Sequence, residues 1–284
     1  MNEARGKPMK AQSPAPTRSA AAAPVLLRET IGSIAVLTLN RPQARNSLSE
    51  AMLAELSLEL ETVARDERIR AVVLAANGPA FSAGHDLKEL TAHRTDADGG
   101  RGYTRQVMER CSAVMLSLLR LPQPVVAAVE ATATAAGCQL VATCDLAVAS
   151  ATAKFATPGV HIGLFCSTPM VALSRNVPRK QAMEMLLTGD MISAEDAYRI
   201  GLVNRVVKAG RAREEALELA RKIGAKSAAV VKLGKEAFYQ QLGMNIADAY
   251  AYASEIMVKN MMARDAGEGI SAFVEKRQPR WEDR

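Results

Sequence analysis

The hydrophobic pattern of the first two thirds of the chain alternates between two periods. Short apolar runs, each typical of a buried strand, occur at 34–39, 71–76, 125–130 and 146–149. Between two of these runs, apolar residues recur every three or four positions, as on one face of a helix, at Met52, Leu53, Leu56, Leu60 and Val63. Strands that alternate with helices in this way predict an α/β fold with crossover connections.

Turn and capping residues set the expected ends of several elements. Gly32-Ser33 lies between two strand-like runs and predicts a hairpin over residues 25–39. Ser47 and Glu50 have the spacing of a capping box, which predicts that the next helix begins there. Thr168-Pro169 fits a helix N-cap followed by the first helical residue. Further helices are expected near 103–120, 179–187, 193–199 and 212–223, with a strand at 203–207.

The C-terminal part of the chain has no strand pattern after Ala225. Helical patterns occupy 227–241, 246–263 and 266–275, and the middle one has a broad apolar face formed by Ala249, Ala253, Ile256, Met257, Met261 and Met262. Three helices have little surface to bury alone, so this face is expected to pack on the body of the chain or on another copy. The predicted organisation is an N-terminal segment (1–24), an α/β core (25–225) and a helical region (226–284).

Residues 1–24 differ in composition from the rest of the chain. They are rich in alanine, proline, serine and basic residues, with Glu3 as the only acid, and they lack the apolar stretch of a secretory signal. Two interpretations remain open: a disordered tail, or a mitochondrial transit peptide, which this acid-poor composition permits. The corresponding locations are the cytoplasm, if the protein is bacterial, or the mitochondrial matrix.

Composition and charge narrow the functional classes. The chain has 284 residues, of which 49% are hydrophobic and 23% charged, as in a globular protein. No apolar run approaches the ~20 residues that span a bilayer. The formal net charge of +6 suits an anionic partner, but only 4% of residues are aromatic and they are not interleaved with basic ones, which disfavours nucleic acid. The cysteines lack a CxxC pair and are expected to be reduced thiols.

Two stretches of small residues, at 81–87 and 135–138, each follow a strand-like run. The glycine in each stretch lets a backbone amide approach a ligand closely, because no Cβ atom is in the way. Two such turns could aim two backbone N–H groups at one oxygen atom, which is the geometry of an oxyanion hole. An ordinary strand-to-helix turn is the alternative interpretation of each stretch.

Several motifs occur in the order seen in one large family. They are Leu39-Asn40-Arg41-Pro42 to Asn46-Ser47-Leu48, Phe81-Ser82-Ala83-Gly84-His85-Asp86-Leu87, Gly137-Cys138-Gln139-Leu140 to Cys144-Asp145, Leu187-Thr188-Gly189, Ala197 and Gly201-Leu202-Val203. From about Leu26 to Trp281 the chain resembles the enoyl-CoA hydratase/isomerase (crotonase) superfamily, and 84–90 and 165–169 resemble its branch of enoyl-CoA hydratase domain-containing proteins. The resemblance implies a crotonase-like spiral of ββα units, with a C-terminal helical region that forms homotrimers or hexamers.

The resemblance also implies a site for acyl-CoA thioesters. The oxyanion amides would belong to Ala83 and Ala136, and their hydrogen bonds would strengthen as the thioester oxygen takes on enolate charge. Asp86 is also suited to cap the helix that follows it. Coenzyme A would enter as part of the substrate, since motifs for a separate cofactor or a metal are absent. Contacts to coenzyme A are implied for Arg45, Ala83, His85, Asp86, Leu87 and Lys276.

Both glutamates that act as acid and base in the hydratases of the family are replaced here. By the resemblance, Gln139 stands at the first position and Gly159 at the second, and neither has a side chain that titrates. His161 is the best candidate for another base, since histidine ordinarily titrates at about pH 6.5. In an extended segment it would share a face with Gly159; a histidine bonded to the backbone is the alternative. Cys166 is expected to be an inert thiol rather than a nucleophile.

The function expected from the sequence is that of an acyl-CoA-binding, enoyl-CoA hydratase-like protein of fatty-acid metabolism. Because the acid and the base are replaced, two alternatives stay open. One is another acyl-CoA reaction, such as isomerisation, decarboxylation or thioester hydrolysis, and the other is a noncatalytic acyl-CoA-binding or regulatory protein. Restoring carboxylates at Gln139 and Gly159 is expected to raise the rate of hydration.

Overall fold

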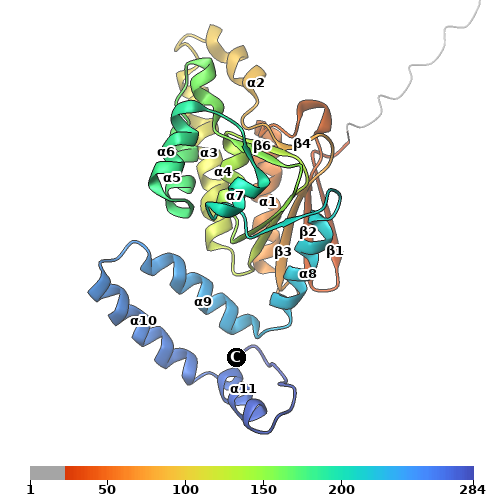
Figure 1. Ribbon diagram of the computed structural model, residues 1–284, viewed down its shortest axis with the longest axis vertical. Helices are drawn as coiled ribbons and strands as arrows, with labels where there is room; N and C mark the ends of the chain where they lie inside the picture. Colours follow the sequence, from red (N-terminus) through yellow and green to blue (C-terminus); the bar gives the residue numbers. More distant parts are fainter. Residues whose placement is uncertain (1–22) are drawn as a thin grey trace, which may run out of the picture.

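A six-stranded sheet forms the centre of the computed structural model, which describes residues 23–284 (Figure 1). Its strands are β1 (Leu26–Ile31), β2 (Ile34–Leu39), β3 (Ala71–Ala76), β5 (Val125–Val129), β7 (Leu146–Ser150) and β10 (Arg205–Val207), in this spatial order. β1 and β2 form the predicted antiparallel hairpin, and all other neighbouring strands of the sheet are parallel. The predicted α/β class is confirmed.

A second, smaller sheet consists of β4 (Ala80–Ser82), β6 (Thr132–Thr134), β8 (Lys154–Ala156) and β9 (Ile192–Ser193). Strands of two or three residues are too short to show a hydrophobic period, so the sequence pattern does not predict them. Along the chain, β3, β5 and β7 are each followed by one of the parallel strands β4, β6 and β8 and then by a helix. This repeat is the spiral of ββα units that the resemblance implied.

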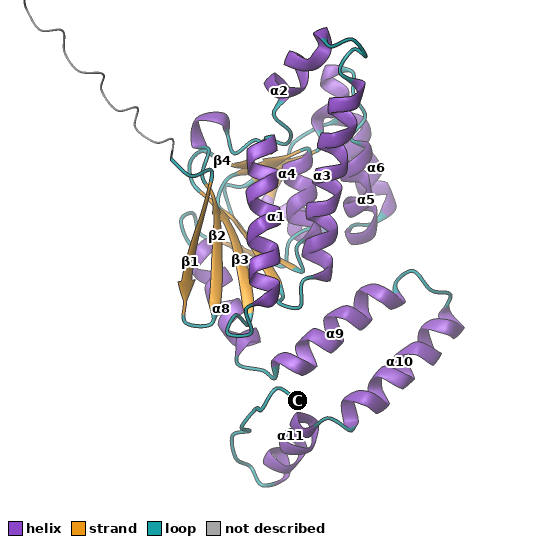
Figure 2. Ribbon diagram, turned by 180° about the vertical axis from the view of Figure 1, so that it is seen from behind, coloured by secondary structure: helices purple, strands orange, loops and turns teal. Residues whose placement is uncertain are grey.

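Helices cover both faces of the main sheet (Figure 2). α1 (Glu50–Arg65), α3 (Arg101–Arg120) and α4 (Ala136–Thr143) contribute to the core on one face, and α8 (Ala212–Gly224) covers the other. Because side chains alternate along a strand, Leu37 and Val72 belong to the first core, whereas Val36 and Val73 pack with α8. Burial on both faces explains why these parallel strands read as continuous apolar runs.

Shorter helices connect the layers, and none of the helices in residues 23–284 is long and apolar enough to cross a membrane. The α-helices are α2 (Leu87–Ala92), α5 (Ser167–Asn176), α6 (Arg179–Thr188) and α7 (Ala194–Arg199). Short 3₁₀ helices occupy Pro42–Ala44, His93–Thr95 and Pro158–Ile162.

Two predicted helix starts are each wrong by two residues. α1 is capped by Ser49 and not by Ser47, because the Ser47 hydroxyl bonds instead to Asp86. α5 has Cys166 and not Thr168 at its N-cap, so Pro169 is the third helical residue and lies in the first turn. Proline fits there because first-turn amides have no acceptor within the helix.

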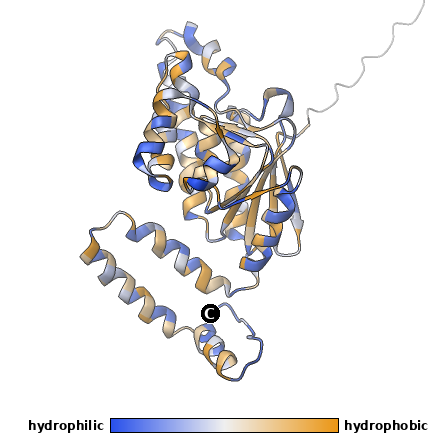
Figure 3. Cartoon of the chain, viewed as in Figure 1, coloured by the Kyte–Doolittle hydropathy of each residue, from blue (hydrophilic) through white to orange (hydrophobic). Residues whose placement is uncertain are grey.

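Three helices, α9 (Ala228–Gln241), α10 (Ile246–Met261) and α11 (Arg264–Val274), form an arm that stands away from the body (Figure 1). α10 packs along α9, and neither helix has a buried residue. Hydrophobic residues recur along the arm (Figure 3), and the side chains of Met257 and Met262 are 60% and 81% exposed. The apolar face predicted from the sequence therefore does not pack on the body of its own chain.

Contacts of α9 with Asp145 and of the C-terminal tail with the core hold this arm against the body. Lys235 of α9 is nearly buried and forms an ion pair with Asp145 at 2.6 Å, while the hydroxyl of Tyr239 donates to the same carboxylate at 2.8 Å. Near the C-terminus, Asp283 pairs with Arg70 of the core at 2.7 Å. These contacts give the arm a defined position although its apolar face is uncovered.

Candidate functional site

The two small-residue turns lie against each other. β4 and β6 are parallel neighbours, so the turns that follow them leave the same edge of the small sheet. A Cβ atom added to Gly84 would lie 2.8 Å from the Cβ of Ala135 and 3.2 Å from the amide nitrogen of Ala136. A Cβ atom added to Gly137 would overlap the carbonyl oxygen of Ser82. The contact between the turns therefore requires glycine at both positions.

The second turn offers an unused backbone donor. Ala135 has φ +50° and ψ −122°, which is strained for a residue with a Cβ atom. It places Ala136 at the first position of α4, where an amide has no acceptor inside the helix. Across residues 23–284, no hydrogen bond uses the Ala136 amide as donor. An oxygen atom of a ligand would satisfy this amide at the positive end of the helix dipole.

In the first turn, the amide of His85 is open, directly after two amides that are engaged. The amide of Ala83, the predicted donor, is engaged, because it donates to the carbonyl of Arg45 at 3.0 Å. The amide of Gly84 is engaged as well, because it donates to the Ser82 hydroxyl at 3.3 Å. No hydrogen bond within the described chain uses the His85 amide as donor. The amides of His85 and Ala136 are thus two that lack an acceptor beside the contact between the turns.

The loop that precedes α1 holds the first turn in place. Arg45 and Asn46 have φ of +51° and +50°, a left-handed conformation that asparagine tolerates better than most residues. Asn46 is fully buried, and its side chain accepts the Arg41 amide at 2.7 Å. It also donates to the carbonyls of Asn77 and Ala80 at 2.8 Å each. This one side chain therefore joins the loop to the residues just before the first turn.

Asp86 ties the same loop to the start of α2. It accepts the Lys88 amide as the N-cap of α2, and its carboxylate bonds to Arg41 and to the Ser47 hydroxyl at 3.1 Å. Burial alone would raise the pKa of Asp86, but the hydrogen bonds from Ser47 and Arg41 outweigh burial and lower this pKa below its usual value. Asp86 thus has the capping role, and Leu87, the first residue of α2, has a half-exposed side chain.

Two polar side chains at these turns are largely covered. Oε1 of Gln139 makes no hydrogen bond within residues 23–284, whereas the His85 ring lies against the backbone of Leu48, which favours its charged form. Burial outweighs this contact and lowers the pKa of His85 below its usual value, so the ring is neutral at pH 7. Gln139 lies in the first turn of α4 and is only 5% exposed. The described chain therefore leaves this oxygen of Gln139 unsatisfied.

Gly159, which the resemblance assigns to the second glutamate position, has no room for a side chain. It lies in the 3₁₀ helix Pro158–Ile162, and a Cβ atom there would lie 2.7 Å from the carbonyl oxygen of Leu164 and 2.9 Å from Sγ of Cys166. Gly159 does not have a positive φ, so the obstacle is crowding and not backbone strain. The expectation that a carboxylate can be restored at 159 is therefore corrected, because the segment up to Cys166 would have to move.

His161 and Cys166, the other candidates, are both engaged in the fold. His161 is exposed, and its Nε2 lies 2.8 Å from the carbonyl oxygen of Thr188, as in the backbone-bonded alternative. The prediction that it shares a face with Gly159 is wrong, because this segment is a 3₁₀ helix and not extended. Burial raises the pKa of the Cys166 thiol, which therefore stays protonated.

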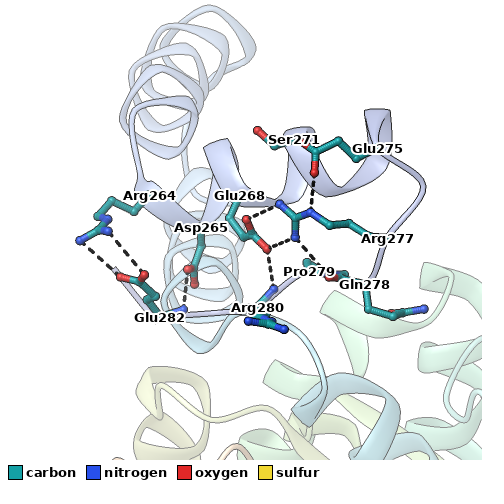
Figure 4. A pocket seen from close by; sticks show the side chains of 10 residues that line it. All are labelled: Arg264, Asp265, Glu268, Ser271, Glu275, Arg277, Gln278, Pro279, Arg280 and Glu282. Atoms are coloured by element: carbon teal, nitrogen blue, oxygen red, sulfur yellow. Dashed lines mark hydrogen bonds and ion pairs between the residues drawn. The ribbon is translucent and has the colours of Figure 1, made fainter.

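The structure separates the two cations that the resemblance assigned to coenzyme A. Arg45 is exposed beside the first turn, whereas Lys276 follows α11, at the opposite end of the molecule from α2 (Figure 1). Within one chain, Lys276 therefore does not reach the turns. A surface hollow of about 940 Å³ at this end is lined mainly by charged side chains, of which Glu268 and Arg277 form a two-pronged ion pair (Figure 4). These charges hold the C-terminal tail against α11.

The sequence reasoning missed Asn46 and Arg41 as residues that shape the site. Asparagine in a short loop between a strand and a helix commonly adopts a left-handed conformation, so Asn46 did carry a signal. The ion pair of Arg41 with Asp86 joins residues 45 positions apart, and no local pattern reveals such a pair.

Comparison with known proteins agrees with this fold. The enoyl-CoA hydratase/isomerase family matches residues 29–284. The rat enoyl-CoA hydratase domain-containing protein 3, mitochondrial, is 50% identical over 245 residues, which cover 86% of this chain and 80% of the relative. The crystal structure of an enoyl-CoA hydratase from Mycobacterium smegmatis has a TM-score of 0.86 and 54% identity, over 91% of this chain and 99% of that one. The crystal structure of human enoyl Coenzyme A hydratase domain-containing protein 3 has a TM-score of 0.86 and 47% identity, over 90% of this chain and 100% of that one.

The chain belongs to the enoyl-CoA hydratase/isomerase family, as its motifs indicated. Its fold is that of the crotonase superfamily, and the turns at Gly84 and Gly137 lie where the strands of the small sheet end. Over most of its length the chain is similar to enoyl-CoA hydratase domain-containing protein 3 from mammals.

Proposed function

We propose that this protein binds acyl-CoA thioesters and that the amides of His85 and Ala136 form an oxyanion hole for the thioester oxygen. The observation that carries the proposal is the contact between the two glycine turns, beside which both amides lack an acceptor in the described chain. His85 replaces Ala83 in this role, because the Ala83 amide is engaged by Arg45. Two such donors hold an oxygen more strongly as it becomes negative, so the site favours an enolate.

The reaction at this site is proposed to differ from ordinary hydration. Gln139 has no proton to exchange, Gly159 has no room for a carboxylate, and His161 is bonded to a backbone carbonyl. The enolate-stabilising amides suit isomerisation or decarboxylation of an acyl-CoA, and thioester hydrolysis needs the same oxyanion contacts. A noncatalytic acyl-CoA-binding or regulatory role in fatty-acid metabolism is the remaining alternative, distinguished by affinity without turnover.

Contacts to the coenzyme A part of the substrate are proposed for exposed cations and for the start of α2. Arg45 lies beside the first turn and can pair with a phosphate, and Asp86 and Leu87 begin the helix that follows this turn. Lys276 reaches a site only in another copy of the chain, which fits a homotrimer or hexamer. The uncovered apolar face of α10 supports such an assembly, because exposed apolar patches of this kind mark interfaces.

The names of the relatives bear on where the protein acts. The relatives from rat, mouse and human are named as mitochondrial, which supports the mitochondrial matrix, whereas bacterial relatives such as that of Rhizobium meliloti support the cytoplasm. The segment on which the transit-peptide interpretation depends, 1–24, lies outside the described residues except for its last two positions.

Isothermal titration calorimetry with butyryl-CoA tests the proposed function. The wild type is expected to bind with an affinity that falls as salt rises, because phosphates pair with exposed cations. Gly84→Ala drives a Cβ atom toward Ala135 and Ala136 and is expected to weaken binding by about tenfold or more. Gly32→Ala is the matched control: its φ is also positive, but nothing lies within 4 Å of a Cβ atom there. No binding by the wild type, or an equal loss in both variants, contradicts the proposal.

A further inference from the structure

An exposed apolar surface lies on the body of the protein, apart from the arm. We call it the 162–171 face. Its large apolar side chains are each between 40% and 59% exposed, and they are Ile162, Leu164, Phe165, Met170 and Val171. The first three lie at the end of the 3₁₀ helix Pro158–Ile162 and in the loop after it, and the other two lie on α5. Exposed apolar side chains that gather in this way mark a surface of contact with another molecule or a membrane.

The backbone of the loop holds its apolar side chains outward. The Leu164 amide donates to the Gly159 carbonyl at 2.9 Å, and the Ser167 amide donates to the Phe165 carbonyl at 2.7 Å. Gly163, at the turn, has φ +75° and nothing within 4 Å of a Cβ atom. The loop is therefore closed by its own hydrogen bonds, and the exposure of its side chains is a fixed property of the fold.

The charges around this face have one sign. Residues 146–183 contain no aspartate or glutamate. Arg175 extends along α5 toward the face, because its guanidinium donates to the Val171 carbonyl at 3.0 Å. Arg179 and Lys180 occupy the first turn of α6, which lies beside α5 (Figure 1) and has no acid in that turn. None of these three cations forms an ion pair within residues 23–284.

Charge and apolar surface together identify the occupant of this face. Two cations in the first turn of a helix are unfavourable, because the N-terminal end of the helix carries a partial positive charge. An anionic partner offsets this repulsion, whereas a second copy of a chain with net charge +6 adds to it. The surface of a bilayer with acidic phospholipids offers anionic headgroups together with a hydrocarbon boundary that takes up apolar side chains.

We infer that the 162–171 face, together with Arg175, Arg179 and Lys180, docks the protein on the surface of a membrane that contains acidic phospholipids. The apolar side chains enter the boundary between headgroups and hydrocarbon, and the three cations pair with headgroup phosphates. This docking does not depend on the proposed acyl-CoA site.

Sedimentation with lipid vesicles tests the inference. The vesicles consist of phosphatidylcholine alone or of phosphatidylcholine mixed with phosphatidylglycerol. The wild type is expected to bind the mixed vesicles about tenfold more tightly or better, and this preference is expected to fall as salt rises. Leu164→Ser is expected to weaken binding to the mixed vesicles by about tenfold, because an apolar side chain no longer enters the bilayer. The double variant Arg179→Gln/Lys180→Gln is expected to weaken it by about tenfold or more and to reduce its salt dependence.

Each variant has a matched control elsewhere on the body. Leu58→Ser changes a leucine of α1 that is 57% exposed, against 53% for Leu164. Arg221→Gln/Lys222→Gln removes the same pair of cations from the last turn of α8. Both controls are expected to bind the mixed vesicles as the wild type does, and melting temperatures show that each variant is folded.

Equal binding of the wild type to the two kinds of vesicle overturns the inference, and so do equal losses in the variants and their controls. Light scattering without vesicles tests the other occupant. If Leu164→Ser lowers the molar mass and leaves vesicle binding unchanged, the face is a contact between copies and the inference fails. The comparison of the two kinds of vesicle with the wild type decides even where a variant does not fold.

Discussion

Asn46→Ala is the substitution for which the structure predicts the clearest loss of stability. The wild-type side chain is fully buried and makes three hydrogen bonds, one from the Arg41 amide and two to the carbonyls of Asn77 and Ala80. Alanine removes all three while φ stays at +50°. The loop that holds the first turn then loses its connection to the residues around β4.

The magnitude follows from these contacts. Each hydrogen bond contributes about 1 kcal/mol net, and a buried partner left unpaired adds to the cost. The Ala80 carbonyl stays buried after the substitution, whereas Asn77 is exposed and can be hydrated. The left-handed conformation costs alanine about 1 kcal/mol. We therefore expect Asn46→Ala to lower the free energy of unfolding by about 4 kcal/mol.

Urea titration of the wild type and three variants checks this value. Asn46→Gly removes the same bonds but tolerates the positive φ, so its loss is expected to be about 1 kcal/mol smaller. Asn77→Ala is the control, because the carbonyl that Asn46 uses belongs to the backbone; its expected effect is below about 1 kcal/mol. A loss below about 1 kcal/mol for Asn46→Ala would refute the reasoning, since the loop would then be held by other contacts.

Three further predictions concern the missing acid, an acidic pH and the arm. Gln139→Glu is expected to raise the rate of crotonyl-CoA hydration by about 10²-fold. Adding Gly159→Glu is expected to bring no further gain in rate and to lower the melting temperature, because a side chain at 159 is crowded. A higher rate in the double variant than in Gln139→Glu alone would contradict this crowding. The pKa of Asp86 is lower in the folded state, so its contribution to stability is present above about pH 4 and is lost as pH falls through the folded-state pKa. Urea titrations should therefore show a smaller loss between about pH 5 and pH 3 for Asp86→Asn than for the wild type, and an equal loss would argue against the lowered pKa. Lys235→Met leaves the largely covered carboxylate of Asp145 without its cation and is expected to lower the free energy of unfolding by about 3 kcal/mol. The control, Lys232→Met at an exposed position, should change the free energy of unfolding by less than about 0.5 kcal/mol. Similar values for the two variants would show that the ion pair does not anchor α9.

Long elements could be predicted from the sequence because their periods are visible within one segment. The hairpin around Gly32, the strand at 71–76 and the helix that ends at Asp66 all lie where the pattern placed them. The short strands β4, β6 and β8 could not be predicted, since three residues contain no period and their pairing depends on strands about 20 to 50 residues away. The ββα spiral therefore became visible only through the resemblance to a family.

The approach of the two glycine turns to each other could be predicted from the sequence, but the identity of an open amide beside them could not. Whether Ala83 is free depends on the left-handed backbone of Arg45, which turns its carbonyl to within 3.0 Å of the Ala83 nitrogen. Likewise, the crowding at Gly159 arises from Leu164 and Cys166, whose approach is a property of the folded segment. Small residues reveal where backbones come close, and only the fold reveals which donors remain.

Gln139 and Gly159, which the resemblance assigns to the two glutamate positions of the family, differ in a way that bears on the proposed function. At Gln139 the helix and the buried side chain are in place, and a single change of amide to carboxylate alters the chemistry without altering the shape. At Gly159 the backbone itself fills the space, because the Leu164 amide donates to the Gly159 carbonyl at 2.9 Å and closes the segment. The open amides at these turns, together with the closed second position, support the proposal that the protein holds a thioester without adding water to it.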